Sequence, residues 1–503
     1  MKKITAALLI IMVTGSLFLS CQSDLGDTVI GASGTSLGSV DTDGDGTSDG
    51  TAIDSDGDGE ADGIDTDGDG TIDEEWSSDY TITDSSDSSS DGSSSDTETE
   101  DTTAPAEITD LTLTEVSKNG YGVLSFSWTA PSDSDFSMVK VYYYTVYSST
   151  DQYSREIEKG TNEVNISGQS FSSYSTLVFK TVDTSENESD GTSVKVYVPN
   201  SAALSSSLSV TYVNSSNVSD LDSLLTTEGY YLIEEDLDLD AISGYWEPVS
   251  SFSGVLAGNG HTISNLSIDS STAESGSSTL TSNVGFIAKL TENSEIFGVI
   301  LDDLNITIDS DTNLSNVGSL VGNSDDGIIS YCGASGTIDA PGCTYVGGLI
   351  GYDWYTDDDP KKCYADVTVT GSSYVGGFGG RLFGAVDCYA TGTVTGDSYV
   401  GGFEGQIAGA VTRCYSAGGV SGSSNYGGFI GSKSSSTLNV KNCFYNSGNN
   451  FAGESDNYAT SITLTDSDEF TNFDFTSDSP VWSIDSSKTI NSGMPYLTDL
   501  KPE

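Results

Sequence analysis

The sequence predicts an all-β protein in which a small β-sandwich is followed by a right-handed parallel β-helix, with a disordered acidic stalk at the N-terminus. Three observations lead to this fold class. Residues 24–101 carry 25 acidic side chains and no lysine or arginine. Residues 104–198 alternate with the strand period of two. The C-terminal half repeats a glycine-rich unit, as solenoids do.

The composition is strongly acidic. Asp and Glu total 76 against 17 Lys and Arg, so the formal net charge is -59. The only arginines are Arg155, Arg381 and Arg413. A chain with so few cations cannot neutralise a row of phosphates, so we expect no nucleic-acid partner. Divalent cations are the partners that this charge attracts.

The N-terminus has the pattern of an export signal. Two lysines precede an apolar run over residues 6–19, which is shorter than the roughly 20 residues that span a bilayer. The ending "LFLSC" resembles the lipobox of bacterial lipoproteins. The resemblance implies that Cys21 is acylated, that acyl chains anchor the protein, and, because Gln22 follows, that it resides in the outer membrane. The alternative is a cysteine that merely ends an ordinary signal.

One nine-residue pattern occurs three times in the acidic segment. The stretches "DTDGDGTSD", "DSDGDGEAD" and "DTDGDGTID" each place carboxylates at positions 1, 3, 5 and 9 and a glycine at position 6, where the chain must turn around an ion. This oxygen-rich spacing suits calcium, which takes about 6 to 8 oxygen ligands. The candidate ligands are Asp41, Asp43, Asp45, Asp49, Asp54, Asp56, Asp58, Asp62, Asp65, Asp67, Asp69 and Asp73.

These loops have no room for the flanking helices of an EF-hand. Position 12 of the loop that begins at Asp54 is Asp65, which also opens the next loop. Such sharing resembles thrombospondin type 3 repeats, which implies a continuous calcium array over residues 41–76. The alternative is a solvated acidic linker. We expect almost no apolar core here and, without metal, a chain kept extended by charge repulsion.

Residues 104–198 predict a small sandwich. Apolar and polar side chains alternate in several short runs separated by Pro, Asp, Ser and Gly clusters. The segment resembles a fibronectin type III domain in "LSFSWTAPSDSDFSMVKVYY", in Tyr174 at the tyrosine-corner position, and in the ending "TVDTSENESDG". The resemblance implies that Trp128 is a core anchor and not a binding residue.

An internal repeat organises the C-terminal half. Aligned on "YVGGLIG", "YVGGFGG" and "YVGGFEG", the units share a glycine at positions 285, 318, 347, 376, 401 and 427. Units of this length cannot bury a face alone and must stack on their neighbours, which predicts a parallel solenoid with one unit per turn. The glycines would then allow corners where a Cβ would clash or where φ is positive. A phosphate-binding loop is excluded, because no lysine and helix follow.

The cysteines share a second column. Cys332, Cys363, Cys388, Cys414 and Cys443 recur at one place in the unit, and four of them precede a Tyr or Phe. Alternation along a strand predicts that the thiols lie inside the coil and the rings outside. Neighbours in register on parallel strands have poor disulfide geometry. Cys343 lies outside the column, and a bridge from it to Cys332 or Cys363 stays open.

The repeat resembles the GLUG-motif repeats of bacterial surface proteins, in "YVGGLIG" and in "CYATGTVTGDSYVGGF". The flanks extend the resemblance: "FSGVLAGNGHTISNLSI" is similar to the opening coil of such proteins, and "VWSIDSSKTINSGMPYL" to their closing segment. The resemblance implies a β-helical fold, with adhesion as the activity usually suggested.

We expect no catalytic site and therefore no enzyme. The only histidine, His261, lies in "GNGHT", a structural turn by the same resemblance, and Arg381 and Arg413 occupy different offsets in their units. The turn with the most candidate binding side chains is the enlarged "YDWYTDDDPKK", in which aromatic rings and carboxylates could form a platform for a sugar. The simpler interpretation, which we favour, is a solvated loop. Its candidate contact residues are Trp354, Tyr355, Asp357, Asp358 and Asp359.

The predicted organisation has eight parts. They are a lipoprotein signal peptide (1–20), a short tether (21–40), calcium-binding repeats (41–76), a Ser/Asp-rich linker (77–103), a fibronectin type III-like domain (104–198), a linker or cap (199–229), a GLUG-type β-helix (230–458) and a closing segment (459–503). We expect a surface-exposed lipoprotein of the bacterial outer membrane that displays a rod for adhesion or for weak binding of glycans or surface proteins. The alternatives are a polysaccharide lyase or hydrolase and a purely structural spacer. The oligomeric state stays open.

Overall fold

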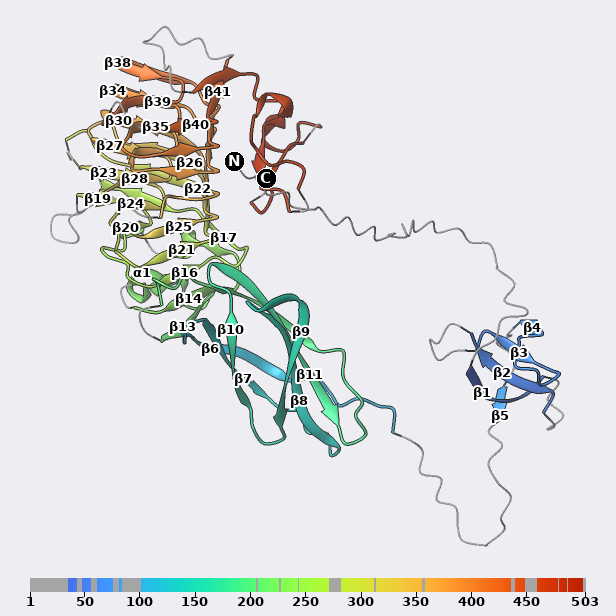
Figure 1. Ribbon diagram of the computed structural model, residues 1–503. Helices are drawn as coiled ribbons and strands as arrows, with labels where there is room; N and C mark the ends of the chain where they lie inside the picture. Colours follow the sequence, from blue (N-terminus) through green and yellow to red (C-terminus); the bar gives the residue numbers. More distant parts are fainter. Residues whose placement is uncertain are drawn as a thin grey trace, which may run out of the picture. The chain divides into compact units, whose positions relative to one another are not determined.

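The computed structural model describes residues 35–42, 48–55, 61–75, 81–83, 101–204, 207–225, 228–242, 244–270, 282–311, 314–354, 358–435, 439–447, 459–477, 479–485 and 487–500. The chain divides into two compact units, Met1–Thr99 and Glu100–Glu503. Almost every element in both units is a β-strand (Figure 1). The predicted all-β class, with a sandwich followed by a solenoid, is confirmed.

The N-terminal unit contains a five-stranded antiparallel sheet in the order β4-β3-β2-β1-β5. Its strands are β1 (Thr35–Asp41), β2 (Gly50–Asp54), β3 (Gly63–Asp65), β4 (Glu74–Glu75) and β5 (Thr81–Thr83). Val40, Ala52 and Ile64 form a small buried core. The expectation of a disordered, extended stalk is therefore wrong for the described residues, whereas the apolar core is as small as expected. Each repeat supplies one or two aliphatic side chains next to its acidic loop, and pairing the strands gathers them.

The larger unit begins with a sandwich of two antiparallel sheets. One contains β6 (Thr109–Lys118), β7 (Gly122–Thr129) and β10 (Glu163–Gln169); the other contains β8 (Phe136–Thr145), β9 (Ser148–Glu158), β11 (Ser173–Asp183) and β12 (Thr192–Val198). Phe179 packs edge-on against both Phe126 and Trp128, with ring centroids 5.2 and 5.8 Å apart. Trp128 is 5% exposed, as expected of a core anchor.

The sandwich continues into the solenoid through a shared sheet. Strand β13 (Leu208–Val213) pairs antiparallel with β6 of the sandwich and parallel with β14 (Tyr230–Ile233) of the rod. The segment expected to be a linker or cap over residues 199–229 therefore contains a strand that joins the two folds. It also contains a single turn of helix, α1 (Leu221–Leu224), which follows the 3-10 turn η1 (Val218–Asp220).

The rod is a parallel solenoid of about seven turns, built from three stacks of strands. The first stack contains β14, β16 (Val255–Ala257), β21 (Glu295–Phe297), β25 (Ile328–Ser330), β32 (Ala385–Val386), β36 (Val411–Thr412) and β40 (Val440–Lys441). The second contains β20 (Ile287–Leu290), β24 (Val321–Ser324), β28 (Ile350–Asp353), β31 (Gly379–Leu382), β35 (Glu404–Ile407) and β39 (Ile430–Lys433).

The third stack is a curved sheet that covers the rest of the coil. One part contains β15 (Leu237–Asp238), β17 (Thr262–Ser264), β18 (Ser267–Asp269), β22 (Ile300–Thr307), β26 (Gly333–Asp339), β29 (Tyr364–Thr370), β33 (Tyr389–Ala390), β37 (Tyr415–Ser416), β41 (Phe444–Asn446) and β42 (Thr460–Ile462). The other contains β19 (Asn283–Val284), β23 (Asn316–Gly318), β27 (Tyr345–Gly347), β30 (Ser373–Gly376), β34 (Val394–Gly401) and β38 (Val420–Gly427). A short 3-10 turn, η2 (Leu239–Ala241), follows β15.

The predicted glycine register is confirmed. Gly347, Gly376 and Gly401 pair directly on successive turns. A Cβ added to any of them would lie 2.0 to 2.1 Å from a backbone oxygen three residues later, so only glycine fits. None of the three has a positive φ, contrary to part of the expectation; the left-handed residues are instead Tyr374 and Tyr399, two positions earlier.

The closing segment packs along the side of the rod. It contains η4 (Ser467–Glu469), β43 (Trp482–Ser483), η5 (Asn491–Gly493) and β44 (Tyr496–Leu497). The cysteines of the column described above are called the ladder cysteines. The aromatic rings that directly follow them in the sequence point out of the coil, but the closing segment buries these rings. Tyr389, Tyr415 and Phe444 form one cluster with Phe470 and Trp482. The outer ring column is therefore a second hydrophobic core.

Candidate functional site

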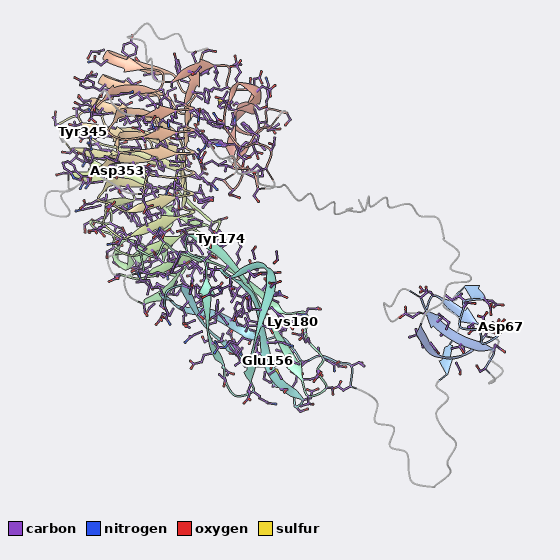
Figure 2. All side chains as sticks on the ribbon, viewed as in Figure 1. Asp67, Glu156, Tyr174, Lys180, Tyr345 and Asp353 are labelled. Atoms are coloured by element: carbon purple, nitrogen blue, oxygen red, sulfur yellow. The ribbon has the colours of Figure 1, made fainter. Side chains whose placement is uncertain are left out.

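The third acidic loop has the geometry of a candidate cation site. Asp65, Asp67 and Asp73 each bring a carboxylate oxygen within 4.8 Å of the other two. The two oxygens of Asp65 accept hydrogen bonds from the backbone N–H groups of Gly68 and Gly70, at 2.7 and 2.8 Å. Both glycines are left-handed, with φ of 78° and 86°, which is the sharp turn that the spacing predicts. Figure 2 shows Asp67 at the edge of this unit.

Position 9 of each loop has a structural role that the sequence did not reveal. The Oδ2 atoms of Asp49, Asp62 and Asp73 accept hydrogen bonds from the backbone N–H and the hydroxyl of the second loop residue, at 2.6 to 2.9 Å. These bonds lower the pKa of Asp73. Asp69 instead accepts from Thr71, away from the three clustered carboxylates.

Several predicted site residues lie outside the described part of the chain. For the calcium loops these are Asp43, Asp45, Asp56, Asp58 and the side chain of Asp41, and for the remaining sites Cys21, Tyr355 and Asp357. Asp54, at the start of the second loop, is described and is 5% exposed. The sharing of Asp65 between two loops stays a prediction.

A second carboxylate group lies in the sandwich, and no sequence pattern predicted it. Asp101, Asp135 and Asp183 have carboxylate oxygens within 4.8 Å of one another. Burial opposes the ionisation of Asp183, but hydrogen bonds from Asn187 and Ser185 outweigh it and lower its pKa. The three residues are 34 and 48 positions apart along the chain, so only the fold brings them together.

The five ladder cysteines form the predicted interior column. Each is 4% exposed or less, and each Sγ donates to the carbonyl oxygen two residues earlier, at 3.2 to 3.4 Å. All six cysteines of the rod, Cys343 included, are free thiols. Burial raises the pKa of Cys343 to about 11. These cysteines therefore pack as buried free thiols.

Among its described residues, the enlarged turn presents the exposed ring of Trp354. Trp354 is 63% exposed and stacks on Tyr352, with centroids 5.9 Å apart. The guanidinium of Arg381 lies 4.8 Å from the Tyr352 ring and donates to the Asp353 carbonyl at 3.1 Å. The two described carboxylates of the predicted platform are half-buried. Asp358 pairs with Lys361 at 3.3 Å, and burial raises the pKa of Asp359.

Aromatic rings continue from this turn along the rod. Tyr345, Tyr374 and Tyr399 stack on successive turns, with centroids 5.0 and 4.7 Å apart. Tyr352 packs edge-on against Tyr345 at 4.9 Å, so the stack and the Trp354 turn are continuous. Figure 2 labels Tyr345 at the outer edge of the rod, near Asp353. The sequence repeat predicts this column, but its contact with Trp354 depends on the fold.

Two buried acids lie in the same part of the rod. Burial raises the pKa of Asp353 to about 7, although the Phe383 N–H donates to it at 3.3 Å. Glu404 is 0% exposed, and neither of its oxygens has a hydrogen-bond partner among the described residues. Burial raises its pKa well above the ordinary value. These acids are inside the coil, where a polymer substrate has no access.

The remaining candidates have structural partners. His261 lies 3.3 Å from Asp236 at the surface. Arg413 forms a bidentate pair with Asp387 at 2.6 Å, and Trp482 also donates to Asp387. Neither arrangement provides a pair of catalytic groups that face a shared space. Within the described residues, no helix is both long and apolar enough to cross a membrane.

One pocket was missed by sequence analysis. It has a volume of about 800 Å³ and lies where the sandwich, the rod and the closing segment meet. Tyr174, expected at the buried tyrosine corner, is 37% exposed and lines this pocket. Its ring packs on Phe297 of the rod at 5.4 Å, because the rod occupies the side of the sandwich toward which it points.

A comparison with protein families agrees with the repeat. Residues 313–339 match the family described as the GLUG motif. A stretch of 113 residues is 36% identical to halomucin of Haloquadratum walsbyi, and it covers 22% of this chain but only 1% of halomucin. The chain therefore spans a very small part of that relative.

Solved structures give distant likenesses to both halves. The fn3 domain of human collagen alpha-1(XX) chain is 15% identical, covers 22% of this chain and 93% of its own, and has a TM-score of 0.17. Pectate lyase PelI from Erwinia chrysanthemi is 14% identical, covers 70% of this chain and 90% of its own, and has a TM-score of 0.15.

Proposed function

We propose that this protein is an exported, lipid-anchored protein of the bacterial cell envelope that displays its rod for adhesion, through weak contacts with glycans or surface proteins. The observation that carries the proposal is the continuous aromatic face formed by Trp354, Tyr352 and the Tyr345–Tyr374–Tyr399 stack. Trp354 is 63% exposed and the four tyrosines are half-buried. Aromatic rings in a row suit extended ligands, because each ring adds contact area at little cost in side-chain entropy.

The N-terminal region supports display at a distance from the membrane. Acylation at Cys21 would anchor the chain, and calcium bound by Asp65, Asp67 and Asp73 would neutralise mutually repelling carboxylates and stiffen the acidic unit. The outer membrane, facing the surface, is the location we propose. Calcium acts here as a structural ligand and has no part in a reaction.

Binding is favoured over catalysis by the state of the charged groups in the rod. Asp387 and Arg413 neutralise each other, and Glu404 is enclosed within the coil. A polysaccharide-cleaving enzyme needs carboxylates or cations that face the substrate. Incubation of the protein with a polysaccharide panel is expected to release no oligosaccharides.

The proposal is tested in two steps. Surface proteolysis of intact cells is expected to degrade the protein, and a calcium chelator is expected to accelerate cleavage in the acidic unit. On arrays of glycans and surface proteins, Trp354→Ala is expected to reduce binding at least fivefold, whereas the exposed Tyr245→Ala leaves it unchanged. A protein resistant to proteolysis on intact cells, or blank arrays, would favour a structural spacer instead.

A further inference from the structure

The pocket lies at the junction of the sandwich, the rod and the closing segment, at a gap between the two parts that cover the rod. Ile300, Gly333, Tyr364 and Tyr389 occupy one column on successive turns. Tyr389 and the rings beyond it are buried under the closing segment. Tyr364 and Ile300 line the pocket, between Leu500 of that segment and Tyr174 of the sandwich.

The missing side chain at Gly333 shapes the pocket floor. A Cβ at this position would lie 2.1 Å from the Tyr364 ring, so the ring leans over the neighbouring turn. Tyr331 and Phe297 continue the aromatic surface, with centroids 5.0 Å apart. Figure 2 shows Tyr174 where the sandwich meets the rod, at the edge of this surface.

Polar groups lie in register beside the aromatic floor. Asp302, Ser335 and Asp366 occupy consecutive turns, and the Ser335 hydroxyl donates to Asp302 Oδ1. Thr391 donates to Asp366 Oδ1 at 2.7 Å. Among the described residues, no hydrogen bond occupies Oδ2 of either aspartate. These oxygens, with Asn259 and Thr262, which also line the pocket, offer acceptors and donors.

The charge of the lining restricts the ligand. Asp302, Asp366 and Asp499 contribute three carboxylates, against the single cation Lys195, whose Nζ is already placed 4.2 Å from the Tyr174 ring. An anionic ligand would be repelled, and a purely apolar one would leave the carboxylates without partners. A neutral ligand with many hydroxyls and apolar C–H faces satisfies both surfaces.

We propose that this pocket binds a short neutral oligosaccharide, with sugar rings against Tyr174 and Tyr331 and hydroxyls donated to Asp302 and Asp366. Its volume of about 800 Å³ is within the ~300–1,000 Å³ of small-molecule sites. The proposal goes beyond the adhesive face, because the pocket shares no residue with the Trp354 turn and needs no membrane anchor.

Calorimetric titration of the purified protein tests the proposal. The ligands are tetrasaccharides of glucose, xylose, mannose and galactose, compared with tetragalacturonate and a glucosamine tetramer as anionic and cationic oligomers of equal length. At least one neutral ligand is expected to bind, and more tightly than both charged ones. Tyr174→Ala is expected to weaken binding at least tenfold, and Asp366→Asn, which keeps the acceptor for Thr391, at least threefold.

The controls show whether binding depends on this pocket. Tyr153→Ala removes an equally exposed ring, at 40%, from the same sandwich and is expected to leave titration unchanged. Melting temperatures of all variants check their folding. The proposal is overturned if no neutral oligosaccharide binds, if either charged oligomer binds more tightly, or if Tyr174→Ala and Asp366→Asn both bind as the wild type does.

Discussion

Glu295 is a single carboxyl at the point where two folds meet. It is 0% exposed on β21 of the rod, and it accepts hydrogen bonds from the Tyr197 hydroxyl and, at 2.7 Å, from the Asn200 N–H of the sandwich side. Burial raises its pKa to about 7, and the two hydrogen bonds only partly oppose this shift. The junction therefore holds a proton that the unfolded chain releases at lower pH.

The raised pKa of Glu295 makes stability depend on pH. Between the unfolded value of 4.5 and the folded value of about 7, the folded state holds a proton that the unfolded state has lost. Stability from this group is therefore fully present below pH 4.5 and declines as pH rises to 7. We expect Glu295→Gln to become more stable relative to wild type by about 3 kcal/mol over this window.

Urea unfolding of the two proteins at pH 4.5 and 7.5 measures this difference. The exposed Glu247→Gln is the matched control, and its stability relative to wild type is expected to stay constant between the two pH values. A pH-independent difference between Glu295→Gln and wild type would show that Glu295 ionises in the folded protein as it does in the unfolded chain.

Side-chain pairs between successive turns also stabilise corners of the rod that the sequence pattern did not predict. The residue before each ladder cysteine is left-handed, at Tyr331, Lys362, Asp387, Arg413 and Asn442, with φ from 51° to 55°. Two pairs stabilise these corners: Lys362 lies over the Tyr331 ring at 4.6 Å, and Arg413 pairs with Asp387. The sequence alone does not show that side chains 31 or 26 positions apart are neighbours, because this depends on the register of strands on successive turns.

At the level of elements, the closing segment is a side cover. Trp482 is 1% exposed, and its ring packs within 6.0 Å of Tyr389, Tyr415 and Phe473. Its Nε1 donates to Asp387, which links the cover to the corner that Arg413 also holds. One residue therefore connects the second hydrophobic core to a partly buried ion pair.

We expect Trp482→Ala to destabilise the larger unit by about 3 to 5 kcal/mol, since it leaves a cavity and removes a donor from Asp387. Denaturant unfolding followed by circular dichroism measures the loss, and limited proteolysis is expected to release the closing segment first. Trp354→Ala, in which the ring is 63% exposed, is the matched control and should cost less than about 1 kcal/mol. Equal losses in the two variants would contradict a buried interface at Trp482.

The repeat made most elements of the rod predictable. A glycine that must approach a carbonyl within van der Waals distance, as at Gly376, leaves no choice of residue, so its column is visible in the sequence. The packing of the closing segment is not visible in the sequence, because no sequence repeat relates Trp482 to Tyr415. Likewise, the spacing predicted acidic loops, but the core of Val40, Ala52 and Ile64 depends on pairing short strands whose aliphatic side chains are few.

At the scale of the whole molecule, the sandwich and the rod are one structural unit. The sheet runs from β10 through β6, β13 and β14 to β25, and Tyr230 and Val255 of the rod share a hydrophobic cluster with Phe126 of the sandwich. Folding of one part therefore completes the core of the other. The N-terminal unit has its own small core and joins no strand of the larger unit among the described residues.

This organisation predicts two thermal transitions with different calcium responses. Calcium that binds only the folded acidic loops stabilises them by RT ln(1 + [Ca]/Kd), which is about 2.7 kcal/mol at 100 times Kd. We expect calorimetry to show a small transition from Met1–Thr99 that moves to higher temperature with calcium, and a large transition from Glu100–Glu503. Asp67→Asn is expected to abolish most of the shift, because it removes one of three clustered charges.

The thermal transition that shifts with calcium identifies the calcium-binding site. Asp151→Asn, at an exposed position of strand β9 in the sandwich, is the control and should leave both transitions and the calcium shift unchanged. If calcium moves only the large transition, the ion belongs to Asp101, Asp135 and Asp183, and the acidic loops are a solvated linker as the alternative interpretation holds. Strand β13 is paired on both edges, so in a single transition it loses both partners together. If the sandwich and the rod melt separately, the shared sheet at β13 does not couple them.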